Sequence, residues 1–148
     1  MLIVYRLLIN LIFILSPIIF VIRFFKKKED PKRFKEKLGF FSKKKINGKL
    51  IWFHGASVGE LQSVIPLIEK LEKNKSKKQI LITSNTLSSS KVLKNNNFKK
   101  VVHQFFPIDN NFLIKKFLDY WSPSKAIFID SEFWPNTILN LKKKKIPI

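Results

Sequence analysis

The first 25 residues of the chain are apolar almost throughout. Residues 7–22 carry no charge, and with the apolar residues before them they approach the ~20 residues that a membrane-spanning helix needs. A secretory signal would end in a small-residue cleavage site, and a buried core helix would show a polar face. No such cleavage site is present, and the segment shows almost no polar face. We therefore expect residues 1–25 to anchor the chain in a membrane, by spanning it or, since Pro17 can kink the helix, by shallow monotopic insertion.

Basic residues gather on one side of this apolar segment. Arg23 and Lys26 to Lys28 follow it, whereas Arg6 lies before it. The positive-inside bias then places the remainder of the chain in the cytoplasm. Residues 26–48 are expected to form a basic juxtamembrane helix and linker. In this segment Asp30 and Pro31 suit a helix start and Gly39 suits its end.

From residue 49 on, short apolar runs alternate with stretches of helical period. Apolar positions at residues 61, 64, 65, 68 and 71 predict a helix, in which Pro66 predicts a kink or a late start. Further helices are predicted after Thr86, over residues 110–121 and from Pro135. Buried parallel strands are predicted at residues 50–54, 79–83, 101–106 and 125–130, and the final residues 146–148 read as the start of another strand.

This alternation predicts an α/β fold with a doubly wound parallel sheet, since parallel strands need helical crossovers that cover both faces. The domain is expected to occupy residues 49–148. A strand that begins at Ile146 does not suit the natural edge of such a sheet. We therefore expect the chain to be the amino-terminal part of a longer protein.

The composition is strongly basic, with 29 Lys and Arg against 10 Asp and Glu and a net charge of +19. Such an excess of positive charge favours anionic partners, among them phosphorylated substrates and anionic lipid headgroups. Three of the basic residues are Arg and 26 are Lys, which argues against bidentate base readout and makes nucleic acid a weak candidate. The chain has no Cys, and its two His are not at metal-motif spacing, so no metal site is expected.

Polar residues of possible chemical use follow the predicted strands, where open α/β sheets bind ligands. Glu60 follows the first strand across Gly55 and Gly59, which allow backbone to approach a ligand closely. Glu132 follows the fourth strand, and Ser84 follows the second. Glu60 suits a general base, although an acid at a helix start also stabilises the helix dipole. Glu132 has a similar alternative as a cap for the helix at Pro135.

The segment "GASVG" also resembles the nucleophile elbow of Ser hydrolases, with Ser57 at its centre. That function would need an acid and then a His downstream, and His103 is the one His that follows. His54 ends a strand and is interpreted as a buried core residue.

Together these motifs resemble the 3-deoxy-D-manno-octulosonic acid (Kdo) transferases of lipopolysaccharide synthesis. The resemblance covers nearly the whole chain and rests on the segments "RFKEKLG", "IWFHGASVGELQSVIPLIEKL", "ITSNTLSSSKVL", "FFPID" and "IDSEFWPN". The family implies a GT-B glycosyltransferase with two Rossmann-like domains. The chain would supply the amino-terminal, acceptor-side domain, and the donor-binding domain would lie beyond it.

By this resemblance Glu60 is the base that deprotonates the acceptor hydroxyl during inverting transfer. Glu132, Gly55, Ser57, Gly59 and Ser84 are the substrate-binding candidates. The donor would be CMP-Kdo, bound mainly by the second domain, and the acceptor the lipid A precursor at the cytoplasmic face of the inner membrane. No cofactor and no metal are implied. The alternatives are an α/β Ser hydrolase that uses Ser57 and a noncatalytic membrane-binding module.

Overall fold

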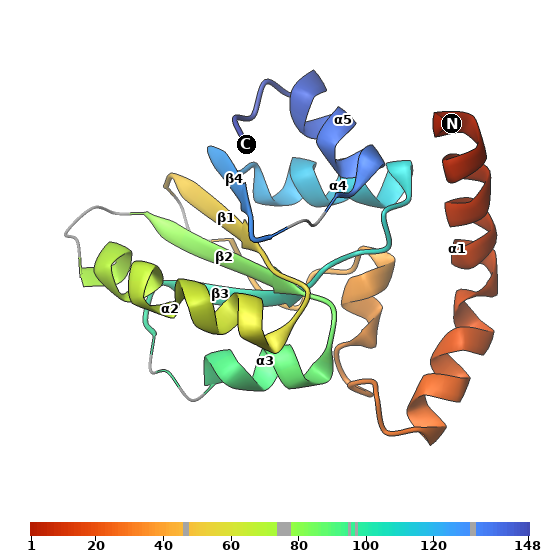
Figure 1. The fold of residues 1–148 in the computed structure, drawn as a ribbon, viewed down its shortest axis with the longest axis horizontal. Helices are drawn as coiled ribbons and strands as arrows, with labels where there is room; N and C mark the ends of the chain where they lie inside the picture. Colours follow the sequence, from red (N-terminus) through yellow and green to blue (C-terminus); the bar gives the residue numbers. More distant parts are fainter. Residues whose placement is uncertain (46–47, 74–77, 95, 97, 131–132) are drawn as a thin grey trace.

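In the computed structural model, described here for residues 1–45, 48–73, 78–94, 96, 98–130 and 133–148, a parallel sheet lies between two layers of helices (Figure 1). The strands are β1 (Leu50–His54), β2 (Gln79–Ser84), β3 (Val101–Phe105) and β4 (Lys125–Phe128), in the order β3-β2-β1-β4. All three pairings are parallel. The predicted α/β sheet is therefore confirmed.

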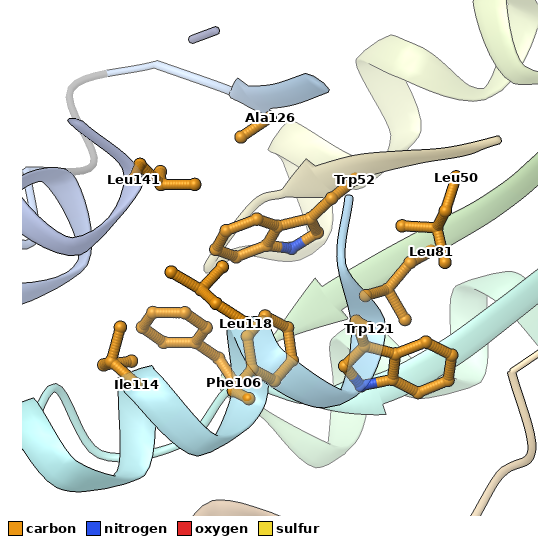
Figure 2. Packing of buried hydrophobic residues seen from close by; sticks show 10 residues of the cluster. Leu50, Trp52, Leu81, Phe106, Ile114, Leu118, Trp121, Ala126 and Leu141 are labelled. Atoms are coloured by element: carbon orange, nitrogen blue, oxygen red, sulfur yellow. The ribbon is translucent and has the colours of Figure 1, made fainter. Parts of the chain in front are cut away.

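The helices cover both faces of this sheet, as its continuous apolar strands require. Figure 1 shows α2 (Val58–Lys73) and α3 (Leu87–Lys94) on one face, and α4 (Asn111–Trp121) and α5 (Pro135–Lys143) on the other. Because side chains alternate along a strand, Trp52 and Phe53 of β1 enter different cores. Trp52 packs in the core under α4 and α5 (Figure 2), and Phe53 packs with Leu61 and Ile68 of α2.

Local signals set most of the helix boundaries. Thr86 Oγ1 accepts a hydrogen bond from the Ser89 N–H at 3.1 Å and caps α3 as predicted. The Asn110 side chain accepts from two N–H groups at the start of α4, and Ser122 ends that helix in the left-handed conformation. Helix α2 begins at Val58, so a start delayed to Pro66 is wrong. Pro66 is exposed, and Leu61 and Ile68 are buried on the face that packs on the sheet.

Before the sheet come a long helix and a short one. Helix α1 (Leu2–Phe25) is 24 residues long and lies to the side of the domain (Figure 1). By length and composition it could cross a membrane, a test that a signal sequence near an amino terminus also passes. The short helix η1 (Phe34–Leu38) is a 3₁₀ helix that ends at Gly39 with a φ of 76°. The predicted helix end at Gly39 is therefore confirmed.

The segment around η1 is tied to the sheet by charged side chains. Glu36 is buried, and its carboxylate accepts from the Phe105 N–H at 2.7 Å and pairs with Arg33 at 2.8 Å. The Arg33 guanidinium in turn donates to the His103 carbonyl at 2.8 Å. These contacts hold residues 33–36 against β3.

Candidate functional site

The carboxyl ends of β1 and β4 meet at the point where the sheet reverses its winding order. The chain proceeds from β1 outward through β2 to β3, and then returns to place β4 on the other side of β1. Ligands of open α/β sheets bind at such a switch point. The Ile129 N–H donates to the His54 carbonyl at 2.9 Å, which brings the loop after β4 against the loop after β1. Asp130, with a φ of 60°, turns the chain there.

Glu60 lies at the start of α2 in the first of these loops. Its Oε2 accepts a hydrogen bond from the Ala56 N–H at 2.8 Å, and its own N–H donates to Ser57 Oγ at 3.2 Å. This reciprocal pattern resembles a capping box, in which the side chains at both ends of the first turn satisfy backbone donors. Glu60 is half-buried, so the carboxylate is fixed in position and still reaches the surface.

The two glycines of this loop differ in their surroundings. A Cβ at Gly55 would lie 3.1 Å from the side chains of Ile129 and Leu61 and 3.3 Å from Glu60 Cβ, so a larger residue there would have to displace these side chains slightly. A Cβ at Gly59 would meet nothing within 4 Å. Gly55 therefore lies in a tightly packed position, and the space beside Gly59 suits the predicted approach of a ligand. Substrate contacts at both positions stay predictions.

The serine candidates are engaged in different ways. Ser57 is exposed, and its hydroxyl accepts from the Glu60 N–H as the cap of α2. Ser84 is fully buried, and its hydroxyl lies 2.9 Å from His103 Nε2. Because the Arg33 guanidinium can only donate to His103 Nδ1, at 3.0 Å, His103 Nε2 carries the proton and donates to Ser84. The Ser84 substrate contact stays a prediction.

His54 is fully buried, as the sequence interpretation held. Its Nδ1 lies 2.8 Å from Thr83 Oγ1, and its ring packs 4.2 Å from that of Phe106, centroid to centroid. Burial lowers the pKa of His54 to about 3. The imidazole is therefore neutral at physiological pH and belongs to the core.

Asp109, which follows β3, has a structural role that the sequence did not indicate. Its Oδ2 accepts from the Asn136 N–H at 3.0 Å, and its Oδ1 accepts from the Thr137 N–H at 2.9 Å and from the Thr137 hydroxyl. Asp109 thus caps α5 from another part of the chain. Burial raises the pKa of Asp109, and these hydrogen bonds oppose the rise. The sequence held one sign of such a cap: Trp134, which precedes Pro135, is a poor capping residue, so the helix at Pro135 needed a cap from elsewhere.

Glu132 lies outside the residues that the structure describes. Its alternative interpretation was a cap for the helix at Pro135. The backbone N–H groups of Asn136 and Thr137 donate to Asp109, and both interpretations of Glu132 stay predictions. Among the residues that the structure describes, no cluster of three or more His, Cys, Asp or Glu side chains could hold a metal ion.

Helix α1 reaches the same end of the domain through polar side chains. The Tyr5 hydroxyl donates to Asp109 Oδ2 at 2.7 Å, and Arg6 Nε donates to Asn136 Oδ1 at 3.0 Å. The side chain of Asn110 donates to Asn10 at 2.8 Å. The few polar residues of this apolar helix therefore face the domain.

Comparisons with known proteins agree with the resemblance seen in the sequence. A family model described as 3-deoxy-D-manno-octulosonic-acid transferase (kdotransferase) matches residues 32–148. The chain is 42% identical over 135 residues to the 3-deoxy-D-manno-octulosonic acid transferase of Rickettsia bellii, which covers 89% of this chain and 32% of that protein. It is 39% identical over 116 residues to a probable mitochondrial 3-deoxy-D-manno-octulosonic acid transferase of Arabidopsis thaliana, covering 78% of this chain and 26% of the relative.

A more distant relative is the 3-deoxy-D-manno-octulosonic acid transferase of Haemophilus influenzae, with 33% identity over 97 residues. That alignment covers 66% of this chain and 23% of the relative. The chain thus spans about a third or less of the length of these three proteins.

Proposed function

Because the chain belongs to the 3-deoxy-D-manno-octulosonic acid transferase family, we propose that it forms the acceptor-side part of a GT-B enzyme that transfers Kdo from CMP-Kdo to the lipid A precursor lipid IVA. The donor would be bound mainly by a second domain outside these 148 residues. A GT-B cleft needs both walls, so we expect no transfer by the 148-residue chain alone. The transferase relatives favour this function over a Ser hydrolase, and the Ser57 hydroxyl already serves as a helix cap.

The observation that carries the proposal is the Glu60 carboxylate, held half-buried at the switch point of the sheet. In the proposed step an acceptor hydroxyl attacks the anomeric carbon of Kdo as its proton passes to Glu60. The bond from that carbon to the CMP phosphate oxygen breaks, and CMP leaves with the electron pair. Attack on the face opposite CMP inverts the configuration. A carboxylate held in position at the start of α2 suits a base in this step.

We further propose that α1 binds the enzyme to the cytoplasmic face of the inner membrane. Its apolar outer side chains are exposed, and Arg23 and Lys26 to Lys28 follow the apolar run. The net charge of +19 favours both an anionic membrane surface and a phosphorylated acceptor.

The test is to assay the complete protein with CMP-Kdo and lipid IVA, comparing wild type with Glu60→Gln. Gln can still accept from the Ala56 N–H, so the loop is expected to fold. Loss of a general base should lower kcat by roughly 10²–10⁴-fold.

Glu69→Gln is the matched control, because Glu69 is an exposed acid on the same helix, and it should retain activity. Equal turnover by the Glu60→Gln variant would leave Glu60 as a capping residue. A folded, membrane-bound wild type without transfer would favour a noncatalytic membrane module.

A further inference from the structure

A cavity of about 310 Å³ lies between α1 and the carboxyl edge of the sheet. This size is at the lower end of the ~300–1,000 Å³ typical of small-molecule sites. Its walls combine one face of α1 with the residues that follow β2, β3 and β4. Most of the lining is apolar and consists of Ile9, Ile12, Ile19, Phe20, Phe106, Pro107, Ile108 and Trp134. The ligand that such walls fit is a hydrocarbon chain.

The cavity borders exposed apolar side chains of α1. Ile12 and Ile19 line it and are also 43% and 37% exposed on the helix surface. Other large apolar side chains of α1, such as Ile14 and Ile18, are exposed as well. Apolar side chains of α1 therefore lie both in the cavity wall and on the exposed side of the helix, which suits a hydrocarbon chain at this position.

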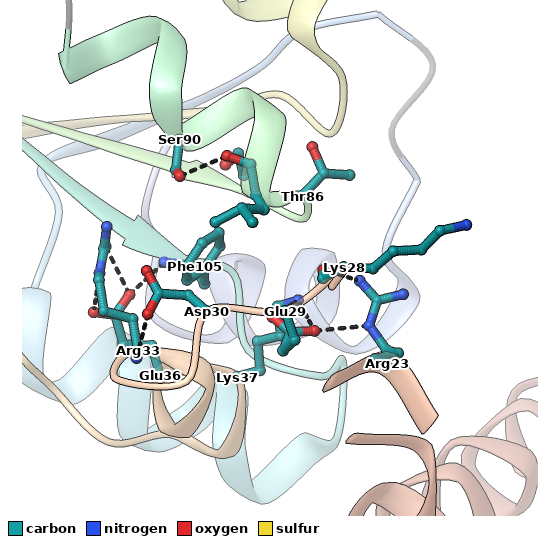
Figure 3. A network of polar contacts seen from close by, with 12 residues as sticks. Arg23, Lys28, Glu29, Asp30, Arg33, Glu36, Lys37, Thr86, Ser90 and Phe105 are labelled. Carbon is teal, nitrogen blue, oxygen red and sulfur yellow. Dashed lines mark hydrogen bonds and ion pairs between the residues drawn. The ribbon is translucent and has the colours of Figure 1, made fainter. Parts of the chain in front are cut away.

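The lining also contains a charged group of three side chains. Glu29 is fully buried and pairs with Arg23 at 2.7 Å and with Lys37 at 2.7 Å (Figure 3). Around Glu29, two cations against one carboxylate leave one positive charge in excess. Asp109 is the other carboxylate of the lining, and it accepts hydrogen bonds from Tyr5, Asn136 and Thr137. Such an excess beside an apolar cavity is complementary to an anionic headgroup attached to a hydrocarbon tail.

We propose that this cavity receives one acyl chain of the acceptor, with an acceptor phosphate near Arg23 and Lys37. The proposal rests on the proposed function, since it names the lipid part of the same substrate. Asn85 and Phe106, which follow β2 and β3, line the cavity, and Glu60 follows β1 at the same edge of the sheet. A chain held there would keep the sugar end of the acceptor at the edge where Glu60 lies. Helix α1 would then form a wall of the substrate site in addition to anchoring the protein.

The test uses the 148-residue chain in nanodiscs of zwitterionic lipid and needs no transfer activity. The probe is 12-bromododecyl phosphate, whose bromine quenches tryptophan fluorescence on contact. Trp134 lines the cavity, whereas Trp52 and Trp121 are fully buried in the core. We expect saturable quenching in the wild type that is lost in Trp134→Phe. Inorganic phosphate should not compete, and a trimethylammonium probe with the same chain should bind more weakly.

Two variants fill the cavity from opposite walls, Ser16→Phe from α1 and Ile108→Phe from the loop after β3. Each should weaken saturable quenching roughly tenfold, the effect of losing about two buried methylene groups. Ile18→Phe is the control, because Ile18 is 62% exposed on the outer side of α1, and it should behave like the wild type.

Quenching that rises linearly with probe and is equal in all these proteins would overturn the cavity proposal. Because the readout is binding, its outcome is separate from that of the transfer assay. Saturable quenching combined with no transfer by the complete protein would overturn the proposed function and leave an acyl-binding cavity. Transfer by the complete protein combined with no saturable quenching would overturn the cavity proposal and support the proposed function.

Discussion

At the scale of single residues, His54 is held in a setting that excludes its charged form. Its ring lies among Phe106, Phe128 and Trp134, and its Nδ1 contacts the Thr83 hydroxyl at 2.8 Å. Burial there penalises the imidazolium. The folded protein therefore binds a proton at His54 far more weakly than the unfolded chain does.

This difference predicts a pH dependence of stability. The pKa of His54 falls from 6.5 to about 3 on folding, so its contribution is complete above pH 6.5 and is lost as the pH falls from 6.5 towards 3. The slope should reach about 1.4 kcal/mol of unfolding free energy per pH unit. Denaturant unfolding in micelles at several pH values measures it. His54→Gln, which keeps His103 and all carboxylates, is the control and should show a flatter curve. Parallel curves for the two proteins would contradict the prediction.

The residues of the site were predictable to different degrees. Glu60 and Ser57 were found from the sequence because a change from strand to helical period marks their turn. The structure shows that Glu60 takes part in the cap of α2, and its role as a general base stays a prediction. Asp109 was missed as a cap because its partners Asn136 and Thr137 lie 27 and 28 residues away along the chain. A helix cap that a distant residue supplies has no periodic pattern in the sequence.

At the scale of elements, the sequence predicted the order of the four strands and the helices between them, because short apolar runs alternate with stretches of helical period. The strand expected to begin at Ile146 is not formed. The start of η1 differed from the prediction. Asp30 was expected to cap a helix at Pro31, but its side chain accepts from Lys32 N–H at 2.9 Å and Arg33 N–H at 3.1 Å in a turn, and the 3₁₀ helix begins at Phe34. The contact of Glu36 with β3 holds this short helix. That contact depends on the tertiary fold, so the residues around Glu36 could not predict it.

Helix α5 depends on Asp109 for its first turn. We predict that Asp109→Ala lowers the unfolding free energy by ~2–4 kcal/mol, because it removes a cap and leaves buried donors of Asn136 and Thr137 unsatisfied. Denaturant unfolding measures the change. Asp119→Ala is the matched control: the Asp119 side chain is 51% exposed and pairs with Lys144, so its loss should cost less than ~1 kcal/mol. Equal losses in the two variants would refute a capping role for Asp109.

At the scale of the whole molecule, the contacts of α1 determine how the protein can meet a membrane. Tyr5 binds Asp109 near one end of the helix, and Phe24 packs on Phe34 near the other. These contacts are 19 residues apart, or about 28 Å along a helix, which is close to the thickness of the bilayer core. A spanning α1 in this arrangement would draw the buried polar groups around Asp109 into the bilayer. The helix should therefore lie along the membrane surface, with its exposed apolar side in the lipid.

The chain has no Cys, so single cysteines can report this orientation directly. We predict that Leu2→Cys and Phe25→Cys, at the two ends of α1, both react with a membrane-impermeant maleimide in inverted inner-membrane vesicles, whose cytoplasmic face is outside. Labelling after detergent solubilisation gives the total for each variant. A spanning helix would protect Leu2→Cys until detergent is added and leave Phe25→Cys reactive. That pattern would contradict the prediction and mean that α1 separates from the domain when it enters a membrane. The contacts of Tyr5 and Arg6 with Asp109 and Asn136 would then form only when α1 is not in the bilayer.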